Sequence, residues 1–179
     1  PERARMPLRR LTPAEVPAIR RTPVDAATLA VAARIVEDVR TGGEIAVRAH
    51  AERLGDLEPG GPLVVDRAGL RRALDALPSA DREVLERTAE RIRRFATAQR
   101  GAIGNVSLRI EGGHAGHTVS PVEAAGCYAP GGRFPLPSSV LMTAITARVA
   151  GVGAVWVASP RPALATLAAA ALARETSLA

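Results

Sequence analysis

The most constraining feature of this sequence is a strand, a helix and a second strand joined by short links near the carboxyl end. An apolar run at residues 124–129 precedes a Pro-Gly-Gly loop, and a helical stretch then extends to Ala150. A Gly-Val-Gly turn leads into a second apolar run, residues 154–158. Two strands joined by one helix normally lie parallel in one sheet. The pattern therefore predicts a parallel βαβ unit that belongs to an α/β fold.

Four helices are predicted before this unit, because apolar residues recur three and four positions apart. They cover residues 25–41, 44–54, 66–77 and 79–99. A glycine pair ends the first helix, and Asp66 is the expected N-cap of the third. The buried stripe of the fourth is expected to include Phe95 and Ala96. A short strand is expected at residues 63–65.

A β-hairpin is predicted between the fourth helix and the βαβ unit. Val106, Leu108 and Ile110 alternate with polar residues, a Glu-Gly-Gly turn follows, and residues 117–122 alternate again. The predicted fold is thus α/β: a helical N-terminal region, a β-hairpin, and an incomplete Rossmann-like parallel βαβ unit. The expected divisions are an N-terminal arm with helices, a helical segment with the hairpin, and the start of a Rossmann-like domain, at residues 1–55, 56–121 and 122–179.

Composition and charge argue against several classes of function. No stretch approaches the ~18 uninterrupted apolar residues of a membrane helix, and the first residues lack the apolar core of a secretory signal. We therefore expect a cytoplasmic protein. The single cysteine, Cys127, excludes an intrachain disulfide and is expected to be a small buried residue. The net charge of +6 suggests nucleic-acid binding, but aromatic residues form only 2% of the chain, too few for a base-stacking surface. Neither a membrane nor a nucleic acid is the expected partner.

The loop after the first strand of the βαβ unit is the candidate binding site. Tyr128, the only tyrosine, ends that strand, and Pro130, Gly131 and Gly132 follow. Open α/β sheets bind ligands at the carboxyl ends of their strands, and glycines let the backbone approach a ligand closely. On this interpretation the Tyr128 ring stacks on a base or ribose. The alternative is a tight turn with a packed tyrosine ring and a helix capped by a serine at position 138 or 139. The spacing favours neither, because it is not the G-x-G-x-x-G fingerprint.

Three segments around this loop closely resemble the histidinol dehydrogenase family: GCYAPGG at residues 126–132, PSSVLM at 137–142 and ARVAGV at 147–152. The resemblance extends from about Asp25 to the end of the chain and is most specific between Gly116 and Val152. It implies a homodimeric dehydrogenase that depends on NAD and zinc and is built from Rossmann-like domains. Such an enzyme oxidises L-histidinol to L-histidine in two successive hydride transfers.

The resemblance assigns cofactor-binding residues but no catalytic ones. Tyr128 matches the family's NAD-contacting tyrosine, and Pro130 and Gly131 lie in the same cofactor-side loop. The family's zinc ligands, catalytic Glu-His pair and substrate serine have no counterpart in these 179 residues. The chain also departs from the family pattern: Ala96 stands where the family usually has histidine, His117 where it has glutamine, and the aromatic-Asp pair expected near Leu54 is absent.

The resemblance therefore implies the N-terminal, NAD-side part of a histidinol dehydrogenase-like enzyme of histidine biosynthesis. We expect it to be inactive alone, to need a C-terminal half or a second subunit, and to act on histidinol or a similar alcohol. Two alternatives remain open: a dehydrogenase of another small polyol or amino alcohol, and a non-catalytic relative that acts as a binding or regulatory subunit. His114 and His117 are not expected to bind a metal together, since residues three apart in a strand project to opposite faces.

Overall fold

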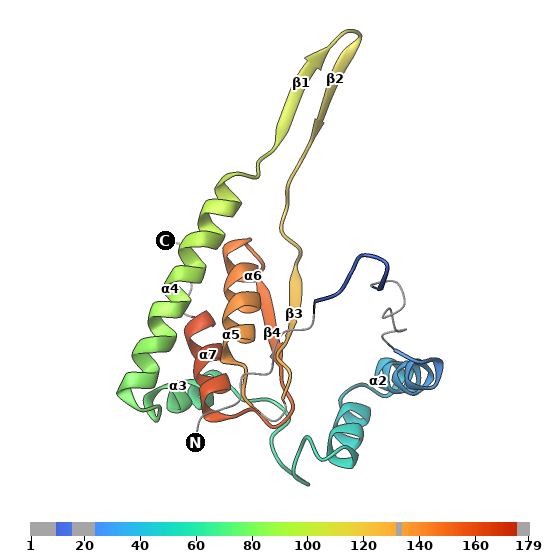
Figure 1. The fold of residues 1–179 in the computed structure, drawn as a ribbon, viewed down its shortest axis with the longest axis vertical. Coiled ribbons are helices and arrows are strands. Elements are labelled where there is room, and N and C mark those ends of the chain that lie inside the picture. Colours follow the sequence, from blue (N-terminus) through green and yellow to red (C-terminus); the bar gives the residue numbers. More distant parts are fainter. Residues whose placement is uncertain (1–9, 16–23, 132–133, 175–179) are drawn as a thin grey trace. The chain divides into compact units, whose positions relative to one another are not determined.

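The computed structural model describes residues 10–15, 24–131 and 134–174. Two compact units are present, Pro1–His50 and Ala51–Ala179. Gly132 of the predicted loop and much of the predicted N-terminal arm lie outside the described residues. In chain order the elements are α2 (Ala26–Arg53), α3 (Arg67–Asp75), α4 (Ser79–Gly101), β1 (Val106–Ile110), β2 (Gly113–His117), β3 (Ala124–Tyr128), α5 (Pro137–Val140), the π-helical turn η1 (Leu141–Ile145), α6 (Thr146–Val149), β4 (Ala154–Ala158) and α7 (Leu164–Arg174) (Figure 1).

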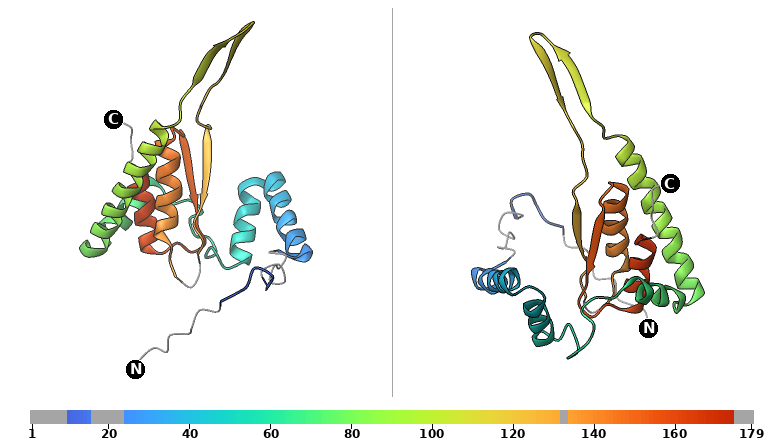
Figure 2. Two further views of the ribbon diagram at one scale, coloured as in Figure 1. Left: turned by 45° about the horizontal axis from the view of Figure 1, so that its top comes forward. Right: turned by 180° about the vertical axis from the view of Figure 1, so that it is seen from behind.

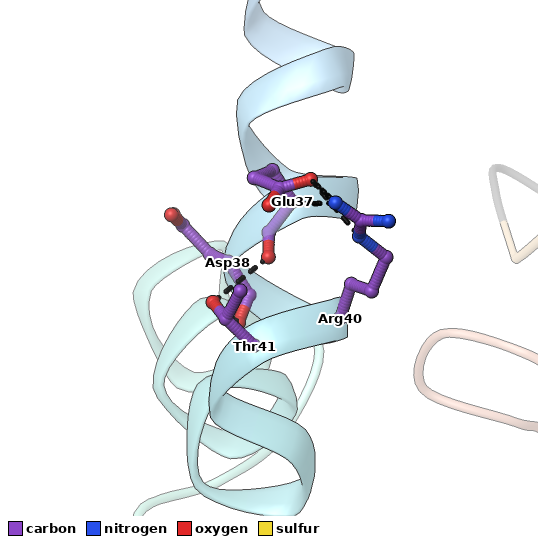
Figure 3. Close-up of polar contacts among 4 residues, drawn as sticks. All are labelled: Glu37, Asp38, Arg40 and Thr41. Atoms are coloured by element: carbon purple, nitrogen blue, oxygen red, sulfur yellow. Dashed lines mark hydrogen bonds and ion pairs between the residues drawn. The ribbon is translucent and has the colours of Figure 1, made fainter.

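Helix α2, most of which lies in the first unit, consists of two helical segments that meet at a kink. Gly43 has φ 56° and ψ −140° there, a left-handed conformation that favours glycine. Just before the kink, the Thr41 hydroxyl donates to the Glu37 carbonyl at 3.0 Å, and Arg40 lies 3.0 Å from the Glu37 carboxylate (Figure 3). The predicted glycine stop between two helices is therefore confirmed.

Two aspartates cap helices with their side chains. Asp25 accepts hydrogen bonds from the Thr28 backbone N–H at 2.9 Å and from its hydroxyl at 2.7 Å, and these bonds lower the pKa of Asp25. In the second unit, Asp66 accepts from the Gly69 N–H at 2.7 Å at the start of α3. The sequence prediction of Asp66 as an N-cap is confirmed.

The core of the second unit lies where α3, α4 and α7 meet the continuous helical run α5–η1–α6. Its largest fully buried side chains are Leu74, Val140, Leu141 and Ile145. Helix α7 contributes mainly alanines, whose small side chains allow the neighbouring helices to approach closely. The helices gather on one face of the β3–β4 sheet (Figures 1 and 2). Along β4 the side chains alternate between exposed and half-buried, as expected for a sheet covered on one face.

Strands β3 and β4 pair in parallel, as the sequence predicts. The register sets Ala124 opposite Ala154 and Tyr128 opposite Ala158, with the helical run between the two strands in the chain. The serine cap expected for that helix is wrong. The helix begins at Pro137, and no side chain caps it, because proline at the first position has a preset φ and no N–H that needs a partner.

Three further expectations are wrong. Residues 63–65 form no strand, since only three residues separate Pro62 from the cap of α3 and, within the described part of the chain, no other strand lies beside them. The second hairpin strand is Gly113–His117 rather than 117–122, because a two-residue turn sets Gly113 directly opposite Ile110. Phe95 is 68% exposed, while Ala96 is buried. Successive residues of a helix differ by about 100° in direction, so only one of these two neighbours can point into the core.

The buried π-helical turn supports a stability prediction. Leu141 is 0% exposed and the next residue, Met142, is 60% exposed. We expect Leu141→Ala to lower the free energy of unfolding by about 2–5 kcal/mol, since it removes core contacts and leaves a cavity. Met142→Ala, the control on the same turn, should change it by less than about 1 kcal/mol. Chemical denaturation monitored by circular dichroism measures both, and equal losses would contradict the described packing.

Candidate functional site

Two loops leave the carboxyl ends of β3 and β4 at the same edge of the sheet, because the strands are parallel. The first loop begins at Ala129, whose N–H donates to the Ala158 carbonyl at 2.9 Å and extends the pairing by one residue. The second loop begins at Ser159 and leads into α7. Ligands of open α/β sheets bind at this edge. The structure therefore brings the predicted loop beside a second loop that sequence reasoning did not single out.

Tyr128 lies at the end of β3 on the face of the sheet opposite the helices. Its side chain is 63% exposed, as is that of Trp156 (65%) on the same face of β4. By contrast, Cys127, the preceding residue, is buried toward the helices, as predicted. The exposure of Tyr128 does not agree with the alternative in which its ring is a packed plug against the following helix. The ring is instead available to a ligand at the sheet edge.

The two loops enclose a small hollow of about 80 Å³ at this edge. Its lining includes Pro130, Gly131, Pro135, Ser159, Arg161 and Thr166. Typical pockets for complete small-molecule ligands measure ~300–1,000 Å³. The hollow alone therefore fits one group of a larger ligand.

Gly131 is required for the close contact between the two loops. A Cβ atom placed on Gly131 would collide with the Pro160 backbone carbonyl and with its ring. Pro130, the residue before it, is exposed beside the hollow. Of the three residues predicted at the site, Tyr128 is at the strand end, and Pro130 and Gly131 line the hollow.

Among the residues that line this hollow, Arg161 carries a positive charge. It has φ 43°, which is uncommon for a residue with a side chain, and its guanidinium lies 3.8 Å from the Asp56 carboxylate. Sequence reasoning missed Arg161. The rule that ligands bind at the carboxyl ends of parallel strands applies equally to the loop after β4. That loop lacks the glycine pair that marks the loop after β3, so no local signal in the sequence pointed to it.

A second, larger hollow of about 330 Å³ lies between α4 and the π-helical turn. It is mainly apolar and is lined by Arg91, Ile92, Phe95, Ala96, Gln99, Met142 and Thr146. Phe95, which we expected in the core, thus borders an open groove. Ala96, one of the departures from the family pattern, forms part of the same lining.

The other candidate polar residues lie apart from the sheet edge. His114 and His117 are opposite Arg109 and Val106 respectively in the hairpin, and His117 Nε2 lies 3.1 Å from the Gly104 carbonyl oxygen. Throughout residues 10–15, 24–131 and 134–174, no three His, Cys, Asp or Glu side chains form a group that would hold a metal ion. Over those same ranges, no helix combines the length and apolar character that crossing a bilayer requires.

Comparison with known proteins gives one consistent result. A sequence model of the family described as Histidinol dehydrogenase matches residues 19–178. The chain is 37% identical over 140 residues to the histidinol dehydrogenase of Nitrosospira multiformis, covering 77% of this chain and 32% of that protein. It is 41% identical over 134 residues to that of Leifsonia xyli, covering 75% and 30%. The chain thus spans about a third of the length of these curated relatives.

The fold has a counterpart of known structure. The crystal structure of histidinol dehydrogenase from Elizabethkingia anophelis matches with a TM-score of 0.72 and 21% sequence identity. The match covers 91% of this chain and 39% of that one. The sequence prediction of a mixed α/β fold with helices, a hairpin and a parallel βαβ unit is confirmed.

The contact between the two loops gives a prediction for Gly131→Ala. The added methyl would meet the Pro160 carbonyl, so we expect a loss of about 1–3 kcal/mol in the free energy of unfolding through overpacking. Gly126→Ala in β3 is the matched control, because a Cβ there meets nothing within 4 Å. Urea denaturation of both variants measures the difference. A Gly131→Ala variant as stable as Gly126→Ala would show that the loops do not touch in this way.

Proposed function

Because the chain belongs to the histidinol dehydrogenase family, we propose that it is the NAD-side part of an enzyme that oxidises L-histidinol to L-histidine in histidine biosynthesis. The relatives extend well beyond the matched region, so this chain supplies one portion of such an enzyme. In this proposal the enzyme works in the cytoplasm as a homodimer. The remaining catalytic groups come from a segment outside these 179 residues.

The observation that carries the proposal is the position of Tyr128. Its aromatic ring is exposed and lies at the carboxyl end of a parallel strand, next to the close-packed loop. Such a ring provides a stacking surface for a flat cofactor ring at the ligand-binding edge of the sheet. Pro130 and Gly131 would shape the loop beneath the dinucleotide. The neighbouring hollow, with Arg161 at its rim, would accept one anionic oxygen-bearing group of the cofactor.

The hydride chemistry belongs to the nicotinamide when NAD is bound, and the protein supplies position and electrostatics. In this chain the assigned tasks are to bind and orient the cofactor. Backbone at Gly131 can approach a ligand closely since no side chain intervenes. Tyr128 limits the direction in which the flat ring can lie. We assign no residue of this chain to proton transfer.

The zinc of the family finds no matching donor set among the described residues. Cys127 is buried, and His50 contacts Asp38 at 3.0 Å, while His114 and His117 project from opposite faces of the hairpin. Tetrahedral zinc sites need about four converging ligands. We therefore place the zinc ligands outside this chain and assign no step to zinc here.

A second candidate substrate follows from the groove between α4 and the π-helical turn. Ala96, where the family usually has histidine, lines that groove together with Phe95 and Met142. Replacement of an imidazole by a methyl group would remove a hydrogen-bonding group and enlarge the hollow. The same fold would then act on another small polyol or amino alcohol. Comparison of histidinol with such alcohols as substrates of the complete enzyme distinguishes the two proposals.

We expect the purified chain alone to produce no NADH from L-histidinol and NAD, with or without added zinc. The reason is that its described residues offer no metal-ligand set and no assigned general base. Absorbance of NADH over time, against a protein-free blank that contains zinc, measures this. Turnover that depends on protein concentration would show that catalytic groups do lie within this chain.

The cofactor role of Tyr128 has its own test. If its ring stacks on NAD, Tyr128→Ala should weaken NAD affinity by roughly 1–3 kcal/mol, the range for base–aromatic stacking. Stability without NAD should fall little, because the ring is mostly exposed. Tyr128→Phe should bind NAD nearly as well.

Trp156→Ala is the matched control for this experiment, since Trp156 is an equally exposed aromatic on the same face but not at the strand end. Its NAD affinity should stay close to that of the original protein. Calorimetric titration of NAD into all three variants measures the affinities. Unchanged affinity in Tyr128→Ala would remove the stacking role.

A further inference from the structure

The first turn of α7 borders the hollow between the loops after β3 and β4. Ala163 and Thr166 both line the hollow, and α7 begins between them at Leu164. The Ala163 carbonyl accepts the first hydrogen bonds of the helix, from the N–H groups of Thr166 at 2.9 Å and of Leu167 at 3.1 Å. Ala163 therefore occupies the N-cap position, where its methyl side chain cannot accept a hydrogen bond from the helix.

The first backbone donors of α7 have no partner in the described part of the chain. Neither the Leu164 N–H nor the Ala165 N–H makes a hydrogen bond there. Such groups point beyond the N-terminus of a helix, where the helix dipole adds a partial positive charge. Free donors beside a hollow favour an anionic oxygen. The helix after β3 differs, because its first residue is Pro137, which has no N–H to donate.

Thr166 points independently to a ligand. It is the one polar residue of the described chain that is buried, at 5% exposed, and its hydroxyl has no hydrogen-bond partner among the described residues. A buried hydroxyl without a partner costs free energy. Since Thr166 lines the hollow, a ligand there would supply the missing partner. Other helical threonines instead donate to a carbonyl oxygen of the preceding turn, namely Thr41, Thr88, Thr143 and Thr146.

The loop between β4 and α7 adds a charge and a second hydroxyl. Arg161 lines the hollow, and its guanidinium makes no hydrogen bond within the ranges that the structure describes. Its Nε lies 3.8 Å from Asp56 Oδ1, which is too long for a hydrogen bond, so its N–H groups can reach a ligand. Ser159 is half-buried in the same lining. The hollow thus brings together a cation, two hydroxyls and backbone N–H groups.

We propose that the first turn of α7, with Ser159, Arg161 and Thr166, forms a subsite for a phosphoryl group and takes the diphosphate of the dinucleotide. The assignment to the dinucleotide rests on the proposed function. A phosphoryl group accepts several hydrogen bonds and carries the negative charge that an arginine and a helix N-terminus favour. A hollow of about 80 Å³ suits one such group. The two loops then divide the cofactor, with a ring at Tyr128 and the phosphates at α7.

Asp56 opposes the ligand at this subsite. Its carboxylate lies against the Arg161 guanidinium, so it competes with a phosphoryl group for the same positive charge. Asp56→Asn should therefore lower the dissociation constant of a phosphate ligand, whereas Arg161→Gln should raise it. A pair of neighbouring variants with opposite effects is expected only if the bound group is an anion that contacts Arg161.

The test titrates inorganic pyrophosphate, ADP and adenosine into the full chain by calorimetry at low salt. Adenosine has the base and the ribose but no phosphate, so it reports on the ring site alone. Thr166→Val keeps the shape of the side chain and removes the hydroxyl. We expect it to raise the dissociation constants of pyrophosphate and ADP by about three- to tenfold. Arg161→Gln should raise both by at least about tenfold. Neither variant should change the affinity for adenosine.

Stability without ligand distinguishes a ligand-binding hydroxyl from a structural one. Thr166→Val should unfold at the same or a higher temperature than the original chain, because it removes a buried hydroxyl that has no partner. A clear fall in that temperature would show that the hydroxyl serves the fold and would overturn its role. Thr88→Val in α4 is the matched control, since its hydroxyl donates to the Val84 carbonyl at 2.7 Å and lies outside the hollow. Arg174→Gln, in the last turn of α7, is the control for charge. Both controls should bind pyrophosphate like the original chain.

The outcomes separate this subsite from the proposed function. Unchanged affinity for pyrophosphate and ADP in Thr166→Val and Arg161→Gln overturns the subsite, and so does the failure of both ligands to bind. NAD affinity that depends on Tyr128 but on neither of these residues overturns the subsite and leaves the proposed function. Pyrophosphate binding that needs both residues, without any NAD binding, supports the phosphoryl subsite and overturns the NAD role. Competition between pyrophosphate and NAD supports both.

Discussion

The parallel pairing of β3 and β4 is the constraint on which the second unit depends. Two parallel strands cannot be joined by a tight turn, so the chain must cross over the sheet, and here it does so through α5, η1 and α6. That crossover carries Val140, Leu141 and Ile145, which are fully buried against α7 and α4. The same geometry places both outgoing loops at one edge. The core and the candidate site thus have one origin.

This dependence explains why the candidate site was accessible to sequence reasoning. The apolar runs that flank the crossover have the composition of buried strands, and a loop after such a strand lies at the ligand-binding edge. Tyr128, Pro130 and Gly131 could therefore be named from the sequence, and the structure places all three at that edge. Whether they bind NAD is a proposal that rests on family membership and on the exposure of Tyr128.

The incorrect predictions share a physical cause. The pattern of apolar residues in a short segment does not say which distant residues that segment will contact in the folded protein. Phe95 has the apolar character of a core residue, but the buried line of α4 passes through Ala96, and the larger side chain borders a groove. Residues 63–65 have strand propensity, but none of the strands that the structure describes lies beside them. Arg161 is unremarkable in sequence and reaches the hollow only because β4 lies beside β3. Each position is decided by neighbours distant in the chain.

We propose that the edge formed by the loops after β3 and β4 is the NAD-binding surface of this chain. Titration of NAD into isotope-labelled protein, with amide chemical shifts followed by NMR, tests it most directly. We expect the largest shifts at Tyr128, Gly131, Ser159 and Arg161, and no change at the hairpin or at the groove beside Phe95. Shifts concentrated at that groove would contradict this binding site. The absence of any shift at millimolar NAD, on the order of the weakest binding that such a titration detects, would contradict it as well.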